Sequence, residues 1–287
     1  MAQIPRAALD YLAKEVDGIS ADAKAKVMRV LEKLDWNDVP ACRDAVVSAV
    51  NAVLDAYSLA AGQASADFFD ASREIAVGSR LGAAVATGRD PDATEGAIRA
   101  FVDKVLKGDI DSFNSAVLSR VGYELKRSAG QTMMENAARD PLKPRFARVP
   151  GGGETCKFCL MLASRGFVYH SKKAASSFDH YHDGCDCKVV CSWDNGGVEG
   201  YDPDAIADRW NDLEWADAEL RAERNGTTAE EEYAKRMRQL GESAKRAKRR
   251  RKNIGSDVQA ARAAKAGASS GVSKKKMKME PSTSGAL

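Results

Sequence analysis

The segment TCKFCLMLASRGFVYHSKKAASSFDHYHDGCDCKVVCSW, residues 155–193, contains five of the six cysteines and all three histidines of this 287-residue chain. Within it, a C-x-x-C pair is followed about two dozen residues later by H-x-x-C-x-C. This is a spacing at which two short segments of chain close a tetrahedral metal site. The segment therefore predicts a metal centre around which the rest of the chain is organised.

The candidate ligands outnumber the four positions of a tetrahedral site. Cys156 and Cys159 are the firm pair, because two cysteines three residues apart can direct both sulfurs toward one point. Two of His182, Cys185 and Cys187 complete the site. Cys187 with His182 is preferred and Cys185 is the substitute, on the expectation that Cys185 and Cys187 would point to opposite faces of a strand. The predicted ion is zinc, which favours sulfur and nitrogen ligands in this geometry. The weaker candidates are His170, His180 and Cys191.

Other interpretations of this segment stay open. Cysteines also form disulfides or are buried as small hydrophobic residues, but the N-terminus lacks the apolar stretch of a secretory signal, and cytosolic synthesis disfavours stable disulfides. A zinc-dependent hydrolase would need an open metal position and a carboxylate base such as Glu154, Asp179 or Asp183. Asp179-His180 is weakly similar to an HNH-type nuclease motif, but no matching Asn and His follow. A cysteine-rich set favours a closed structural site.

Residues 1–145 are predicted to form an α-helical bundle of four to six helices. Between Ala41 and Ile75 the apolar residues recur every three or four positions, which is typical of one face of a long helix. The other predicted helices are 5–16, 20–34, one opened by Asp90-Pro91-Asp92, and one capped by Asp111 or Ser112. No apolar run approaches the about 20 residues needed to cross a membrane, so no membrane partner is expected.

Residues 146–200 are predicted to form a small mixed α/β module. Residues before proline are pushed out of the helical region, so 143–150 is expected to be extended. A short helix is predicted over 154–164, and strands over 167–169 and 187–191. A unit of about 50 residues buries little core by itself, which is the physical argument for a metal staple.

The C-terminal part combines a helical extension with strong positive charge. Residues 201–252 are predicted to be helical, with Asp202-Pro203-Asp204 opening one helix and a Thr227/Glu230 capping box opening the next. Residues 253–287, rich in Ala, Gly, Ser and Lys, are predicted to be disordered.

The net charge of +3 hides an asymmetry between an acidic body and a basic tail. Residues 244–279 carry thirteen Lys and Arg against one acidic residue, whereas residues 1–243 carry a net charge of about −8. Such a run is either a solvated charged face or a phosphate-binding helix end, and its density favours contact with a polyanion, most often nucleic acid. No aromatic residue is interleaved with these cations, so sequence-specific recognition is not expected. The candidate nucleic-acid contacts are Lys245, Arg246, Lys248, Arg249, Arg250, Arg251 and Lys252.

Three motifs of the cysteine-rich region carry a family resemblance: Phe146-Ala147-Arg148-Val149-Pro150, Thr155-Cys156-x-Phe158-Cys159-x-Met161-Leu162-Ala163-Ser164-Arg165-Gly166 and Tyr181-His182-x-x-Cys185-Asp186-Cys187. In combination they resemble the MuF-type minor head proteins of tailed phages, in the form common among phages of actinobacteria. Upstream, Ala66-Asp67-Phe68-Phe69-Asp70-x-x-Arg73 also fits that group, with Phe69 where tyrosine is common. The resemblance covers roughly residues 40–200.

The resemblance implies a structural virion protein, made in the host cytoplasm and incorporated in few copies inside the procapsid near the portal vertex. Its implied partners are the portal and procapsid proteins, with a DNA contact through the basic tail. Some members of this group carry the label of capsid maturation protease. The sequence gives that label little support, because it has no G-x-S-x-G and no serine placed to work with a base and an orienting acid. A zinc-dependent hydrolase and a zinc-knuckle nucleic-acid-binding protein are the alternatives.

Overall fold

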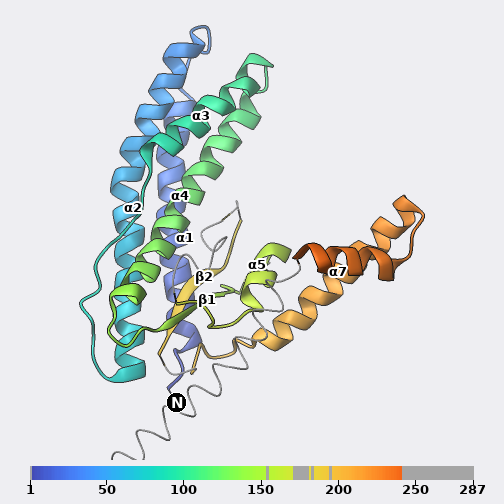
Figure 1. Ribbon diagram of the computed structural model, residues 1–287. Coiled ribbons are helices and arrows are strands. Elements are labelled where there is room, and N and C mark those ends of the chain that lie inside the picture. Colours follow the sequence, from blue (N-terminus) through green and yellow to red (C-terminus); the bar gives the residue numbers. More distant parts are fainter. Residues whose placement is uncertain (1, 153–154, 171–180, 182–183, 194–195, 241–287) are drawn as a thin grey trace, which may run out of the picture.

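A computed structural model of the chain describes residues 2–152, 155–170, 181, 184–193 and 196–240. Long helices form a bundle, a two-stranded sheet lies against one end of it, and a helical hairpin projects away from the sheet (Figure 1). The elements are α1 (Arg6–Leu31), α2 (Val39–Val77), α3 (Pro91–Leu106), α4 (Ile110–Arg139), β1 (Arg145–Val149), α5 (Lys157–Ala163), β2 (Lys188–Ser192) and α7 (Pro203–Asn225), followed by a further helix at 229–240. The predicted fold class, mainly α with a small α/β module, is confirmed.

The first helix is one continuous element and not the predicted pair. α1 runs through Gly18 and Ser20, where we expected a break. A glycine in a helix costs about 1 kcal/mol relative to alanine, but the apolar face continues in phase across it, from Leu12 and Val16 to Ala23, all buried. Tertiary packing of this face therefore outweighs the local preference for a break.

The longest helix, α2, ends at Gly78, whose φ of 80° is the left-handed conformation typical of a helix C-cap. By length and composition alone, α2 is the one described helix that could cross a membrane, contrary to our expectation that no run approaches that length. Core helices of soluble proteins meet the same criterion. Here Val46, Val50 and Leu54 are buried, and α2 packs against α1, α3 and α4.

The bundle holds two separate hydrophobic cores on the same helices. The first, which we call the bundle core, combines the second half of α1 and the first half of α2 with α3 and the first half of α4, and includes Leu54, Ile98 and Phe113. The second, which we call the junction core, combines the other halves of α1, α2 and α4 with both strands, and includes Phe69 and Phe146. Residues of the predicted bundle and of the predicted α/β module thus share one core.

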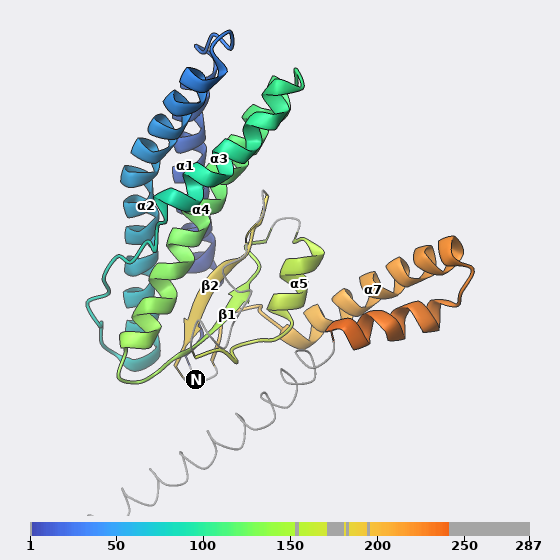
Figure 2. The ribbon, with the colours of Figure 1, turned by 45° about the horizontal axis from the view of Figure 1, so that its top comes forward.

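The sheet is a single antiparallel pair with the register Arg145↔Ser192 to Val149↔Lys188. Figure 2 shows this sheet between the bundle and α5. The strand predicted at 167–169 is reduced to one bridge, in which Tyr169 pairs with Phe146.

A buried ion pair ties the end of the bundle to the sheet. The Arg73 Nε atom of α2 lies 2.8 Å from Asp140 Oδ2, and the indole of Trp193 donates to the same oxygen at 2.7 Å. Burial opposes ionisation of Asp140, but the hydrogen bonds from Arg73, Trp193 and the Leu142 N–H outweigh it and hold the pKa of Asp140 below its ordinary value. Arg73, part of the α2 motif quoted above, therefore has a structural role.

The hairpin that projects from the sheet consists of α7 and the helix at 229–240 (Figure 1). Asp202 caps α7, as its position before Pro203 predicts. The second helix opens with a capping box one residue later than predicted: Thr228 N–H donates to Glu231, and Glu231 N–H donates to the Thr228 hydroxyl at 3.3 Å.

Candidate metal centre

The candidate centre is formed by Cys159, Cys185 and Cys187, whose Sγ atoms all lie within 4.8 Å of one another. The sulfur–sulfur distances are 3.1 Å for Cys159–Cys185, 3.3 Å for Cys185–Cys187 and 2.8 Å for Cys187–Cys159. All six cysteines are free, so these are contacts between thiols and not disulfides. The three side chains are at most 2% exposed.

Two chain segments deliver these sulfurs. Cys159 lies in the first turn of α5, while Cys185 and Cys187 lie in the turn that leads into β2. The two segments are joined next to the cluster by the Thr155 hydroxyl, which donates to the Asp186 carboxylate at 2.8 Å. The predicted meeting of the C-x-x-C and C-x-C segments is therefore present in the fold.

The argument that separated Cys185 from Cys187 is wrong. Residues two apart on a strand point to the same face, so strand geometry gives no reason to separate them, and both cysteines also precede β2, which begins at Lys188. Both sulfurs converge on Cys159, and Cys185 belongs to the cluster together with Cys187. His182, the ligand we preferred, lies outside the described residues.

The remaining candidates are placed differently. Cys156 is half-buried and packs against the cluster, and its Sγ accepts the Cys159 N–H at 3.3 Å as the N-cap of α5. Cys191 is buried in β2 with its Sγ 3.8 Å from the Met133 carbonyl, and His170 is exposed. Glu154, His180 and the basic positions from Lys245 to Lys252 lie outside the described residues, as do Asp179 and Asp183.

Arg148 of β1 is a neighbour of the cluster that ligand spacing in the sequence does not reveal. Its guanidinium is fully buried and donates to sulfur at three distances: 3.2 Å from Nε to Cys187, 3.0 Å from Nη2 to Cys187 and 3.3 Å from Nη2 to Cys185. On its other side, the guanidinium carbon lies 4.0 Å from the centre of the Tyr181 ring. A lone arginine between apolar residues of the extended FARVP segment is the sequence signal that could have marked it.

The protonation chemistry of the cluster follows from this crowding. Hydrogen-bond contacts with Cys185 and Cys187 raise the pKa of Cys159, with burial adding to the shift. The pKa of Cys187 is raised to about 11, because the contact with Cys185 and burial outweigh the opposing effects of Cys159 and Arg148. Burial alone would lower the pKa of Arg148, but Tyr181 and the three sulfurs raise it, so its charge is permanent. The thiols of Cys159 and Cys187 therefore resist ionisation in the metal-free cluster.

The donor set fits a metal ion. Three buried sulfurs that converge on one point are the first requirement of a thiophilic site, and these three could hold an ion. Sulfur ligands about 2.3 Å from a tetrahedral zinc stand roughly 3.8 Å apart, so the sulfurs would each move by less than about 1 Å to admit one. Their burial is typical of closed structural sites and not of catalytic ones, which keep a position open.

The family model of the VG15 protein matches residues 3–213, which include the bundle, the sheet and the cysteine cluster. This chain belongs to the VG15 family. VG15 proteins are viral, of a family found in phages. No curated protein matches the chain, and no solved structure does.

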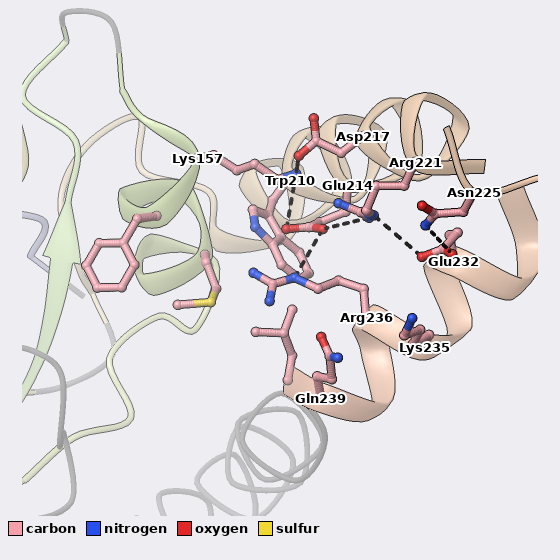
Figure 3. Close-up of a pocket in the computed structure, with 13 residues that line it drawn as sticks. Lys157, Trp210, Glu214, Asp217, Arg221, Asn225, Glu232, Lys235, Arg236 and Gln239 are labelled. Atoms are coloured by element: carbon pink, nitrogen blue, oxygen red, sulfur yellow. Dashed lines mark hydrogen bonds and ion pairs between the residues drawn. The ribbon is translucent and has the colours of Figure 1, made fainter. Parts of the chain in front are cut away.

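A pocket of about 610 Å³ lies between α5 and the hairpin of the VG15-family chain (Figure 3). Its centre is an ion-pair network around Glu214, which is 2% exposed and is approached by Lys157 at 3.1 Å, Arg236 at 3.6 Å and Arg221 at 3.9 Å. Lys157 also pairs with Asp217. Because these charges neutralise one another, the network serves as a joint that fixes the hairpin to α5 at Lys157, two residues before Cys159.

Proposed function

We propose that this VG15-family protein is a structural minor head protein of a tailed phage, of the MuF type, that acts inside the procapsid near the portal and remains in the virion. The family match over residues 3–213 supports the viral part of this proposal. The MuF-type motifs around Arg148, Cys156–Cys159 and Cys185–Cys187 support the head assignment. Their most distinctive residues lie together in one buried cluster, as expected of a structural element.

The metal of this proposal is a structural zinc ion. Cys159, Cys185 and Cys187 supply three ligands, and either Cys156 or His182 supplies the fourth. Cys156 has the advantage that the Cys159 N–H already holds its sulfur beside the cluster. A zinc ion here would tie α5 to the turn before β2, two segments that the chain separates by about two dozen residues.

A structural role is favoured over hydrolysis by one observation, the burial of the cluster. Cys159 and Cys187 are 0% exposed and Cys185 is 2% exposed, so a substrate has no access to a metal held there. Among the described residues, the one group of three or more potential ligands contains neither a carboxylate nor a histidine that could act as a base. We therefore propose that the protein is not an enzyme.

Contact with DNA is proposed for the basic segment Lys245–Lys252. α7 carries the chain away from the sheet, and the helix at 229–240 brings it back toward α5 (Figure 1), where Gln239 and Leu240 line the same pocket as Phe158. That helix ends five residues before Lys245, so the basic segment follows the hairpin and not the bundle in the sequence. The contact would be to phosphates and steeply salt-dependent.

The test is incorporation into particles. Procapsids and virions are purified from cells that express the phage head genes with the wild-type chain, with Cys159→Ser, and with a variant in which all seven cations between Lys245 and Lys252 are replaced by Gln. Quantitative mass spectrometry is expected to find the wild type in few copies per particle, together with portal protein. The Gln variant is expected to be incorporated but to lose salt-sensitive DNA binding.

Two results would overturn the proposal. Absence of the wild-type chain from both procapsids and virions would remove the head assignment. Cleavage of capsid proteins that needs this chain and stops in the metal-free protein would replace the structural role with a hydrolase.

A further inference from the structure

Arg148 occupies a position that buried arginines rarely take. Its residue is 0% exposed, its guanidinium lies within hydrogen-bonding distance of the sulfurs of Cys185 and Cys187, and the ring of Tyr181 covers its opposite side. A permanently charged group in an apolar surrounding is costly unless an opposite charge lies beside it. Thiolates at Cys185 and Cys187, toward which its N–H groups point, would be such a partner.

A metal–thiolate centre supplies that partner. A divalent ion bound by three cysteine thiolates and a neutral ligand has a net charge of −1, and with four thiolates a net charge of −2. We propose that Arg148 is the buried counter-cation of this centre: it neutralises the excess negative charge of the metal-bound sulfurs and orients Cys185 and Cys187 through N–H···S hydrogen bonds. This inference rests on the proposed metal site and goes beyond it by assigning a residue that holds the ligands without binding the ion.

The backbone delivers Arg148 to this position. In the β1–β2 register, Arg148 pairs with Val189, two residues after Cys187. The antiparallel pairing therefore fixes the arginine beside the strand that follows the C-x-C turn. Because a guanidinium is planar and carries several donors in a rigid fork, it can contact two sulfurs and stack on an aromatic ring at the same time, which a lysine cannot do.

Gly130 of α4 leaves room for the Tyr181 ring that covers Arg148. A Cβ atom at Gly130 would lie 2.1 Å from the Tyr181 hydroxyl oxygen and 3.2 Å from Val189 Cγ2. Glycine is thus required for Tyr181 to reach its place over Arg148. Helix α4, the tyrosine ring, the guanidinium and the sulfurs form one continuous stack from the bundle to the centre.

The experiment compares metal affinity in the full-length chain for wild type, Arg148→Met, Arg148→Lys and Gly130→Ala. Arg145→Met is the matched control, because Arg145 is an arginine of the same strand that is partly exposed and is not among the described contacts of the sulfurs. Zn²⁺ affinity is measured by competition with a chromophoric chelator, and Co²⁺ substitution reports the number of thiolate ligands through the sulfur-to-cobalt charge-transfer bands. Thermal unfolding with and without Zn²⁺ gives a second measure through linkage.

Loss of a group that hydrogen-bonds to metal ligands typically weakens metal affinity 10- to 100-fold. We expect Arg148→Met to weaken Zn²⁺ affinity by that factor, and Arg148→Lys to weaken it less because it keeps the charge. Gly130→Ala is expected to weaken it by about 10-fold or less, and Arg145→Met is expected to leave it unchanged. Arg148→Met is also expected to narrow the difference in melting temperature between the metal-bound and the metal-free protein. If Arg148→Met does not fold, the same measurements on Arg148→Lys and Gly130→Ala test the proposal.

The failures of the two proposals are distinguishable. If the wild type binds no stoichiometric metal, the proposed site is overturned and Arg148 has no anion to balance. If the wild type binds one ion and the Arg148 and Gly130 variants bind it within about threefold as tightly, the site stands and the counter-cation is overturned. Equal losses in Arg148→Met and Arg145→Met would also contradict the proposal, because a general destabilisation of β1 would then account for the effect.

Discussion

The two ends of the bundle are formed by the same helices but are held together by different chemistry. At the bundle core, α1, α2, α3 and α4 bury aliphatic and aromatic side chains such as Leu54, Ile98 and Phe113. At the junction core the same α1, α2 and α4 meet the sheet, and there buried charges and thiols lie among the apolar side chains, including Arg148 and the Arg73–Asp140 pair.

This difference separates two ways of stabilising a fold. Apolar contact is non-directional and is spread over many residues, so the bundle core is expected to respond to lost volume and to be indifferent to metal. A few directional contacts hold the junction core together, so its stability is expected to change when one charge, one proton or one metal ion is lost. The predicted module of residues 146–200 therefore obtains part of its core from the bundle and does not depend on the metal for all of its stability.

The largest effect is expected from removal of the proposed metal, by chelation or by Cys159→Ser. Structural zinc sites can contribute on the order of 10 kcal/mol of folding free energy, and here we expect the loss to be concentrated in α5, β1 and β2. Hydrogen exchange should show deprotection of these segments while α1–α4 keep theirs. Equal deprotection of the bundle core would contradict the separation of the two ends.

The same site should be sensitive to pH. Metal ions bind thiolates, and in the metal-free fold contacts with the neighbouring thiols raise the pKa of Cys159, while the contact with Cys185 and burial raise that of Cys187 to about 11. Binding must therefore displace protons, so the apparent metal affinity should rise with pH between 6 and 8. Calorimetry in buffers of different ionisation enthalpy would count the protons released.

In the bundle core, Phe113→Ala is expected to cost about 4 kcal/mol, because it removes a fully buried aromatic ring and leaves a cavity. Urea denaturation measures the change in the free energy of unfolding. Unlike the junction variants, this loss should be the same with and without chelator. Leu59→Ala, which truncates a 58% exposed side chain, is the control and should change stability little.

At the junction, Asp140→Asn is expected to cost about 3 kcal/mol, because it leaves the buried Arg73 without its anion. The pKa of Asp140 is lowered in the folded state, so its contribution is fully present above its unfolded pKa of about 3.9 and is lost as the pH falls through the folded value. The difference in stability between wild type and Asp140→Asn should therefore shrink below pH 4. A difference that is constant from pH 7 to pH 3 would exclude the ion pair as its source.

The smallest effect is expected for Glu95→Gln on the surface of the bundle. Glu95 pairs with Arg99 at 2.7 Å, a distance like that of the Arg73–Asp140 pair, but the two side chains are 38% and 44% exposed. An exposed pair of this kind contributes about 0.5 kcal/mol or less, and salt screens it. A loss comparable to that of Asp140→Asn would show that burial is not what makes the junction pair important.

Local patterns in the sequence were sufficient to predict much of this chain. The spacing of apolar residues from Ala41 to Ile75 predicts α2, the Asp-Pro-Asp segments predict the starts of α3 and α7, and the cysteine spacing predicts that two segments meet. These features depend on residues that are close together in the sequence, so they can be predicted without knowledge of the fold. Errors of one residue, such as Thr227 for Thr228, arose where two equally good caps were adjacent.

Features that depend on distant partners could not be predicted. The continuity of α1 through Gly18 is set by packing across the bundle, and the convergence of Cys159 with Cys185 and Cys187 is set by the meeting of α5 with the segment before β2. Arg148 resembled any other arginine of an extended segment until the β1–β2 register placed it against the sulfurs.

By itself the sequence determined the helical fold class, the pairing of two cysteine segments and the charge asymmetry between body and tail. Only the tertiary structure decided which sulfurs converge on one point, that the module shares a hydrophobic core with the bundle, and that a buried guanidinium lies beside the thiols. The physical reason is the distance along the chain over which each effect acts. Periodicity and ligand spacing act within a segment, whereas burial and charge balance depend on which segments the whole fold brings together.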